Sequence, residues 1–419
     1  MARIAVVGAG VAGLVSAYYL SKRHHVDMYD GDSRLGGHTH TVSVNEPSGN
    51  SVRVDTGFIV FNETNYPHFL QFLADLNVDY QSSDMSFSYT SDDQRLYWGS
   101  DFPTGIFAQR RRWCDPRFYQ FLLGVHRFNR ACLRDFEQGL SDQLTLGDYL
   151  QQRSVSDSVI RYYVLPMTSA IWSASLSDSL NFPLASFVRF WKNHQLLEIG
   201  KGLPWKTITH GSKSYIDRVV PSISGHIRQS TPVCGIDDLG DSIRVTTASD
   251  ALHYDGVVVA THADTALHLL THPSPAHRRL LGAWHYSTNR TVLHTDPVVM
   301  PPRRSAWCSW NVRDFRAGIT TAAAGVTYWM NRLQSLKSAT DYFVTLNDCD
   351  AIRPDRIIRD MVYTHPIMNR ESMATQTELP QLNRQSRVVC CGSYFGYGFH
   401  EDAVRSAIHA ISELEATLR

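Results

Sequence analysis

The hydrophobic and polar positions at the start of the chain change from the period of a strand to that of a helix and back again. The apolar run Ile4–Val7 predicts a buried strand, and the glycine-rich turn after it leads into a helix-like run that carries Val15, Tyr18 and Leu20. The next apolar stretch, HVDMYD, predicts a second strand that ends at Asp30. Strand, turn, helix and strand in this order predict the first unit of a Rossmann-type α/β fold.

Apolar positions in the middle of the chain predict a long helix and a second sheet. The segments RTVLHT and DYFVTL, at residues 290–295 and 341–346, have strand character and predict an antiparallel sheet. Residues 117–137 predict an amphipathic helix, because their apolar members recur at helical spacing: Phe118, Phe121, Leu122, Val125, Phe128, Cys132, Leu133 and Phe136. Arginines cluster on or near this helix. They indicate either that the side of the helix away from the core is basic and exposed to solvent, or that a basic patch meets an anionic membrane surface.

Apolar positions in the last part of the chain predict further strands and a closing helix for the first α/β unit. Residues 231–263 predict two or three strands that end in the apolar run Val257–Ala260. The segment RVVCCG predicts another strand, and a polar–apolar pattern that begins at His400 predicts a closing helix. Glycines at 392, 396 and 398 lie between aromatic residues just before that helix, where core packing does not require glycine.

Composition narrows the class of protein. The length of 419 residues favours two lobes, and 40 basic side chains balance 40 acidic ones, so no basic field points to nucleic acid. No apolar run is long enough to span a bilayer, and the first one carries glycines that are not typical of a signal peptide. Seven cysteines without a C-x-x-C pair indicate reduced thiols, as expected in a cytoplasmic protein.

The first turn has the spacing of a dinucleotide-binding fingerprint. Gly8, Gly10 and Gly13 form G-x-G-x-x-G directly after a predicted strand, so backbone at Val11 and Ala12 can approach a pyrophosphate at the helix N-terminus. Asp30 ends the second strand, next to Gly31, where a carboxylate can hold a ribose diol. The alternative interpretation is a glycine-rich turn that binds nothing.

A second motif follows, Arg34-Leu35-Gly36-Gly37, and with it the sequence resembles the FAD-dependent amine oxidase and phytoene desaturase superfamily. The resemblance implies a glutathione-reductase-type Rossmann domain that binds FAD, and a substrate domain with a mixed or antiparallel sheet and helices. We expect a discontinuous FAD-binding domain at 1–100, 206–270 and 384–419. The substrate-binding domain is then expected at 101–205 and 271–383.

The resemblance also implies which further residues contact FAD. The segment after the glycine doublet and the glycine-containing segment near residue 57 are expected near the flavin, a strand begins against the adenine, and the closing motif lies against the ribityl chain and the flavin's pyrimidine edge. The residues concerned are His38, Thr56, Gly57, Phe58, Val233, Gly392, Ser393, Phe399, His400 and Ala403.

Several phrases are similar to one bacterial subgroup of predicted FAD-binding oxidoreductases that is associated with cyclopropane fatty acid synthases. They include VDTGFIVFNETNYPHF, VVVATHADTAL and GYGFHEDAVRSA, and they spread from residue 54 to residue 407. This resemblance implies a lipid-like small-molecule substrate and a lipid-modifying enzyme as a partner. We therefore expect hydride removal from a modified fatty acyl chain, as by a desaturase or oxidase.

Two other functions stay open: a flavin amine oxidase that acts on a small amine, and a flavin-binding partner without turnover. The candidate catalytic residues are polar groups expected beside the flavin edge, Tyr394, Tyr397 and His400, with Tyr328 from the second sheet. The alternative for the tyrosines is that they only shape the pocket and transfer no proton. The chain has 19 histidines but no metal-binding spacing, and we expect no metal site.

Overall fold

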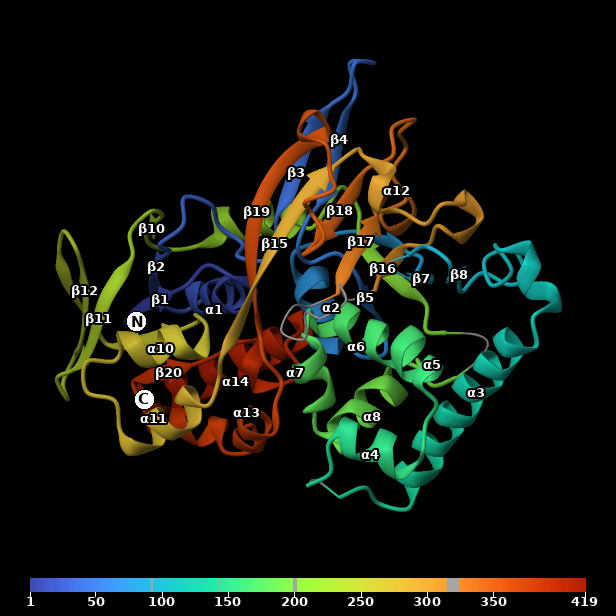
Figure 1. The fold of residues 1–419 in the computed structure, drawn as a ribbon. Coiled ribbons are helices and arrows are strands. Elements are labelled where there is room, and N and C mark those ends of the chain that lie inside the picture. The colour runs from blue at the N-terminus through green and yellow to red at the C-terminus, as the bar shows by residue number, and fades with distance from the viewer. Residues whose placement is uncertain (92, 142, 199–201, 315–323) are drawn as a thin grey trace.

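The computed structural model describes residues 1–419 apart from 92, 142, 199–201 and 315–323, and it is a mixed α/β structure as predicted (Figure 1). Its first sheet is parallel, with the strand order β10-β2-β1-β14-β20. The strands are β1 (Arg3–Val7), β2 (His25–Tyr29), β10 (Ile227–Arg228), β14 (Gly256–Val259) and β20 (Val388–Cys390). Segments from both ends of the chain therefore share one sheet.

Helices cover this sheet because its central strands are apolar on both faces. The side chains of β14 are buried throughout, as expected for an inner strand of a parallel sheet. Helix α1 (Val11–Ser21) packs against α14 (His400–Thr417), which confirms the predicted closing helix and brings the two ends of the chain together. Both termini lie on the same side of the molecule in Figure 1.

The second large sheet has seven strands in the order β19-β15-β18-β17-β16-β7-β8. Its pairs are antiparallel except for β16 and β7, which run parallel. The strands are β7 (Phe87–Thr90), β8 (Tyr97–Gly99), β15 (Tyr286–His294), β16 (Trp310–Arg313), β17 (Gly325–Trp329), β18 (Phe343–Leu346) and β19 (Ile357–Pro366). The two strands predicted near 290 and 341 are confirmed, and segment 1–100 supplies strands to both large sheets. The division into two discontinuous domains stays a prediction.

Three small antiparallel sheets complete the strands. They are β11-β12-β13, β3-β4 and β5-β9-β6. Their bounds are β3 (Thr41–Asn45), β4 (Ser51–Asp55), β5 (Phe61–Asn62), β6 (Tyr80–Ser82), β9 (Trp205–Ile208), β11 (Val233–Asp238), β12 (Ile243–Thr247) and β13 (Ala251–Tyr254). The first of these sheets is the strand unit predicted within residues 231–263.

The remaining helices lie mostly in the middle of the chain, which Figure 1 shows as the green and teal region on the right. The predicted amphipathic helix is α3 (Pro116–Glu137), and it buries Phe118, Phe121, Phe128 and Cys132. The other helices are α2 (Pro67–Asp75), α4 (Leu146–Gln152), α5 (Asp157–Val159), α6 (Leu165–Trp172), α7 (Leu176–Leu180), α8 (Leu184–Asn193), α9 (Lys213–Val219), α10 (Ala263–Leu269), α11 (Pro275–Gly282), α12 (Met330–Leu333) and α13 (Arg370–Thr375).

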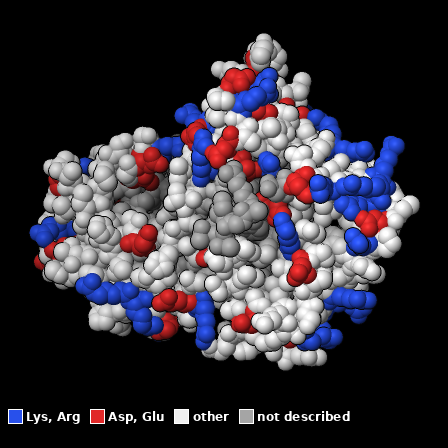
Figure 2. Space-filling view, viewed as in Figure 1, with Lys and Arg blue, Asp and Glu red and all other residues white. Residues whose placement is uncertain are grey.

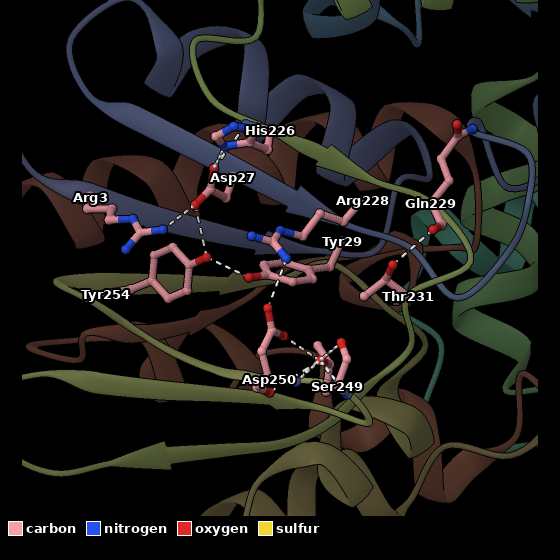
Figure 3. Close-up of polar contacts among 11 residues, drawn as sticks. Arg3, Asp27, Tyr29, His226, Arg228, Gln229, Thr231, Ser249, Asp250 and Tyr254 are labelled. Carbon is pink, nitrogen blue, oxygen red and sulfur yellow. Dashed lines mark hydrogen bonds and ion pairs between the residues drawn. The ribbon is translucent and has the colours of Figure 1, made fainter.

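A buried carboxylate on β2 ties the parallel sheet to β13 (Figure 3). Asp27, on β2, accepts hydrogen bonds from the Arg3 guanidinium at 2.9 Å, the Tyr254 hydroxyl at 3.0 Å and the His226 backbone N–H at 2.9 Å. Burial alone would raise the pKa of Asp27, but these hydrogen bonds outweigh it and lower the pKa to about 2. The ionised carboxylate therefore joins three segments of the fold.

The same cluster offers three metal-ligand atoms, from His25, Asp27 and His226, all within 4.8 Å of one another. Both carboxylate oxygens already accept hydrogen bonds from Arg3, Tyr254 and His226. We therefore interpret the cluster as a structural ion pair with flanking histidines.

Candidate functional site

The turn after β1 brings strand and helix into very close approach. A Cβ added at Gly13 would lie 1.8 Å from the Gly8 carbonyl oxygen, and one at Gly8, where φ is +99°, would lie 2.7 Å from the Ala260 carbonyl oxygen. A Cβ at Gly10 would meet no atom within 4 Å. Gly8 and Gly13 thus let the backbone pack together, whereas Gly10 leaves open space over the turn.

The carboxylate at the end of β2 is fixed over this turn. Asp30 accepts hydrogen bonds from the backbone N–H of Ala9 at 2.6 Å and of Asp32 at 2.8 Å. Burial raises its pKa, and these two N–H groups act in the opposite direction. The carboxylate lines the main cavity, at the carboxyl end of a parallel strand, where the fingerprint requires an acid.

Arg34 holds the second glycine segment in place by hydrogen bonds to its backbone carbonyl oxygens. Its guanidinium donates to the carbonyl oxygens of Gly37 at 2.6 Å and Thr39 at 2.9 Å. Gly37 in turn lies against Gly10, where an added Cβ would be 3.2 Å from the Gly10 Cα. Arg34 therefore shapes the loop that borders the cavity, while its side chain does not line the cavity.

The glycines before α14 make room for a carboxylate and a tyrosine ring. A Cβ at Gly396 would lie 2.0 Å from a carboxylate oxygen of Asp402, which accepts the backbone N–H of Tyr397 at 2.9 Å and of Phe399 at 3.2 Å. A Cβ at Gly392 would lie 2.5 Å from the ring of Tyr394. Close packing of the closing turn on its own side chains thus accounts for two of these glycines.

His400 begins α14 and is oriented by two contacts. Its ring stacks on Phe58 with a centroid distance of 3.5 Å, and its Nε2 lies 3.1 Å from the Thr39 hydroxyl. Burial lowers the pKa of His400 well below its ordinary value, so the imidazole is uncharged at neutral pH. The next residue, Glu401, accepts the backbone N–H of Phe69 at 2.9 Å and so fixes α14 against α2.

One cavity of about 560 Å³ joins these segments, and it brings together nearly all of the candidate residues. Its lining includes Gly8, Gly10, Val11, Ala12, Asp30, Gly31, Gly36, Gly37, His38, Thr56, Gly57, Phe58, Val233, Tyr328, Gly392, Ser393, Tyr394, Tyr397, Phe399, His400 and Ala403. Gly13 and Arg34 do not line the cavity, and their contacts lie within the two glycine segments. Their part in FAD binding stays a prediction.

Sequence reasoning missed several residues of this cavity. Trp172 ends α6, and Trp310 stands perpendicular to Tyr328 at 4.8 Å in the seven-stranded sheet. The indole N–H groups of Trp172 and Trp310 and the hydroxyl of Tyr394 are buried without a hydrogen-bond partner among the described residues. No local sequence signal marks the two tryptophans, because strand pairing and helix packing bring them to the cavity.

Three histidines besides His400 also line the cavity, although their spacing along the chain is not that of a metal site. His38 Nε2 donates to the Thr364 carbonyl oxygen at 3.0 Å, and the Asn289 amide donates to His365 Nδ1 at 3.0 Å. Burial lowers the pKa of His38 to about 3 and that of His365 to about 4. Burial also lowers the pKa of His262, whose ring stacks on Tyr286 at 4.2 Å. These three imidazoles are therefore uncharged at neutral pH.

The cavity fits a dinucleotide. No side chain among the described residues caps the N-terminus of α1, whereas at α14 the Asp402 carboxylate accepts the backbone N–H of the N-cap residue Phe399. Residues of both N-termini line the cavity. Helix N-termini with free N–H groups attract phosphate and other negative charge. Open space over Gly10 gives a pyrophosphate room, and the Asp30 carboxylate can accept hydrogen bonds from ribose hydroxyls.

Comparisons with known proteins agree with this geometry. The model of the family "Flavin containing amine oxidoreductase" matches residues 11–332. A search of curated proteins finds no match. Many solved structures are similar in fold.

Three of those structures illustrate the range of the fold. Cyclohexylamine oxidase from Brevibacterium oxydans aligns at a TM-score of 0.69 and 13% identity, over 100% of both chains. Putrescine oxidase bound to putrescine aligns at a TM-score of 0.68 and 12% identity, over 99% of both chains. A fatty acid isomerase from P. acnes that produces CLA aligns at a TM-score of 0.68 and 12% identity, over 98% of both chains.

The family match covers most of the chain, and the glycine turns, the acid at Asp30 and the two helix N-termini supply what a flavin dinucleotide needs. The protein is thus an oxidoreductase whose cofactor is FAD, and the chain belongs to the family of flavin-containing amine oxidoreductases.

Proposed function

We propose that this protein removes a hydride from an aliphatic, lipid-like substrate, a modified fatty acyl chain, as a desaturase or oxidase. The lining of the cavity supports this proposal. Away from the glycine turns the lining is aromatic and aliphatic, with Trp172, Trp310, Leu346 and Met368. Among the described residues, Asp30 is the sole carboxylate, and no lysine or arginine lines the cavity. Such walls suit a hydrocarbon chain and exclude water.

The residues that would hold FAD come from the turns and helix N-termini of the parallel sheet. We assign Gly10 and the first turn of α1 to the pyrophosphate, Asp30 to the ribose and Val233 to the adenine. We assign the N-terminus of α14, where His400 and Ala403 line the cavity, to a position beside the flavin ring, so that the helix dipole faces the cofactor. When bound, FAD supplies the acceptor for the hydride. The apolar walls then hold the reacting C–H bond in place and keep water away from it.

The contacts of the candidate catalytic residues suggest a different role for each. Burial raises the pKa of Tyr328 and of Tyr394, so both keep their protons at neutral pH and act as hydrogen-bond donors. Tyr394 has a hydroxyl without a partner among the described residues, and we assign it to orient substrate or flavin. His400 is held by Thr39 and Phe58, and we assign it to shape the flavin site. Tyr397 lines the cavity as an aromatic wall.

We also propose the two-domain division given by the sequence, with the cavity at the boundary of the two domains. The similarity to a subgroup associated with cyclopropane fatty acid synthases supports a lipid-modifying enzyme as the partner that supplies the substrate. In the alternative without turnover, the protein would serve that enzyme only as a flavin-binding partner.

A second candidate substrate is a small amine. The family description names amine oxidoreductases, and the perpendicular pair Trp310 and Tyr328 offers aromatic faces to such a group. A carboxylate beside these rings would strengthen the binding of a protonated amine, but the only carboxylate in the described lining is Asp30, which follows β2 of the parallel sheet and not a strand of the seven-stranded sheet. The charge distribution therefore favours a neutral, apolar substrate.

The test is anaerobic mixing of the FAD-loaded protein with matched candidates, followed by flavin absorbance. One arm uses fatty acyl chains that carry a methyl branch or a cyclopropane ring, and a second arm uses putrescine and cyclohexylamine. We expect the flavin colour to bleach with a modified acyl chain and to persist with the amines. Bleaching by the amines alone would assign the amine function. Colour that persists with every candidate would favour the partner without turnover.

A further inference from the structure

Exposed aromatic and aliphatic side chains gather in one segment of the chain. Among the described residues, nine large hydrophobic side chains are exposed, and four of them fall between residues 102 and 123. They are Phe102 (79% exposed), Trp113 (51%), Tyr119 (39%) and Leu123 (54%). Scattered exposed hydrophobic residues are ordinary, but a group of this kind marks an interaction surface.

Local contacts hold the aromatic members of this group in place. Trp113 lies in the short 3₁₀ helix η1 (Arg110–Cys114), and its ring stacks on the buried ring of Phe107 at 3.9 Å. The Tyr119 hydroxyl donates to the Trp113 carbonyl oxygen at 3.0 Å. The indole of Trp113 is therefore presented to solvent by a packed support.

Helix α3 continues the same surface. Tyr119, Leu123, Arg127 and Arg130 follow at intervals of four, four and three residues, so they lie on one side of the helix. All four are exposed, whereas Phe118, Phe121 and Phe128 on the other side are buried. The exposed side of α3 thus changes from apolar at its start to basic further along.

The segment that carries these side chains has an excess of positive charge. Residues 101–137 contain seven arginines against four acidic residues, Asp101, Asp115, Asp135 and Glu137, in a chain whose overall charge is zero. Arg112 pairs with Asp115 at 2.5 Å, and Arg134 pairs with Asp135 at 3.1 Å. The other arginines are exposed and have no ion pair within the described part of the chain: Arg110, Arg111, Arg117, Arg127 and Arg130. Figure 2 shows basic side chains gathered along the edge where α3 lies in Figure 1.

We propose that the basic aromatic face formed by Trp113, Tyr119 and Leu123, with the exposed Arg127 and Arg130 on the same side of α3, docks the protein on an anionic lipid bilayer. Indole and phenol rings favour the boundary between headgroups and acyl chains. Arginines beside them meet lipid phosphates while their stems cover apolar surface. Charge complementarity therefore identifies the partner as an acidic membrane surface.

The protein would lie on this surface and would not cross it. No helix in the described ranges has the length and apolarity of a membrane span. Nucleic acid also attracts arginine, but a bilayer in addition takes up exposed apolar side chains such as Trp113 and Leu123. The binding test below separates a bilayer from an acidic protein. The proposal does not depend on the substrate, because the face and the cavity are formed by different side chains.

The test is sedimentation of the FAD-loaded protein with two kinds of vesicle, phosphatidylcholine alone and phosphatidylcholine mixed with phosphatidylglycerol. We expect the wild-type protein to bind the mixed vesicles, with an affinity that falls as salt is raised, and to bind the neutral vesicles at least tenfold more weakly. The double variant Arg127→Glu/Arg130→Glu should lose at least tenfold in affinity for the mixed vesicles. Trp113→Ala should weaken binding severalfold without removing its salt dependence.

The matched control is Arg278→Glu/Arg384→Glu, which changes the same charge at two exposed arginines outside this face and should bind like the wild type. Flavin absorbance of each variant reports that it is folded and loaded. Equal binding of the two double variants, or equal binding to neutral and mixed vesicles, would overturn the proposal. Binding to an acidic protein or to nucleic acid without binding to the vesicles would overturn it as well.

Discussion

Gly10 and Gly13 lie in the same turn, yet a methyl group added to each would meet different surroundings. At Gly13 the methyl group would lie 1.8 Å from a backbone oxygen, whereas at Gly10 it would enter open space over the turn. Glycine at position 13 is therefore required by the packing of the fold, whereas glycine at position 10 leaves room for the ligand. This difference gives a prediction that separates folding from binding.

Gly13→Ala should lower the free energy of unfolding by about 2 kcal/mol, because backbone must move to accept the methyl group. Gly10→Ala should change the stability of the FAD-free protein by less than about 0.5 kcal/mol, since φ at this residue is −68° and no atom is near. It should nevertheless weaken FAD binding by about tenfold or more, as measured by quenching of flavin fluorescence. Unchanged FAD affinity in Gly10→Ala would place the phosphates elsewhere.

Tyr394 carries a buried hydroxyl without a hydrogen-bond partner among the described residues. Tyr394→Phe removes that unsatisfied group, so the FAD-free protein should gain about 1 kcal/mol of stability in urea unfolding. The matched control is Tyr254→Phe, which loses the hydrogen bond to Asp27 and should cost about 1 kcal/mol. A loss of stability in Tyr394→Phe as large as in the control would show that its hydroxyl is paired in the free protein.

At the scale of elements, the buried carboxylate of Asp27 joins β2, the segment before β10, and β13. Asp27→Asn should lower the free energy of unfolding at neutral pH by about 2 kcal/mol, because it weakens the charge-assisted hydrogen bonds that the buried carboxylate accepts from Arg3 and Tyr254. Asp355→Asn, at an exposed pair with Arg356, should cost about 0–0.5 kcal/mol. Chemical denaturation of the three proteins measures both values.

The same pair predicts a pH dependence. The pKa of Asp27 is about 2 in the folded chain, below the ordinary value of an aspartate. Its stabilising contribution is therefore nearly complete above about pH 4, the ordinary pKa of an aspartate, and is lost as the pH falls from about 4 toward 2. The stability difference between wild type and Asp27→Asn should shrink over the same interval. A difference that stays constant down to pH 2 would contradict the assignment.

The elements themselves could be predicted where a local signal marks them. The turn at Gly8, the carboxylate at Asp30 and the helix from His400 each carry glycine spacing or a polar–apolar period that short-range sterics impose. The pairing of β16 with β7 could not, because it joins residues 310–313 to residues 87–90 and depends on tertiary contacts. Trp172 and His365 reach the cavity through such contacts, so sequence reasoning missed them.

At the scale of the whole molecule, the account requires segments from both ends of the chain to enclose one ligand. The turn after β1, the loop at 34–39 and the start of α14 border the same cavity as side chains of the seven-stranded sheet. Each segment alone provides only a part of the donor set. FAD binding should therefore be a property of the intact fold and should raise its stability in proportion to ligand excess.

That requirement gives the most direct test of the account, which is a titration of the FAD-free protein with FAD while flavin fluorescence is followed. We predict saturation at a single FAD per chain, with a visible flavin spectrum that remains with the protein through gel filtration. A protein that stays colourless after reconstitution, or that binds FAD no more tightly than Gly10→Ala does, would contradict the account.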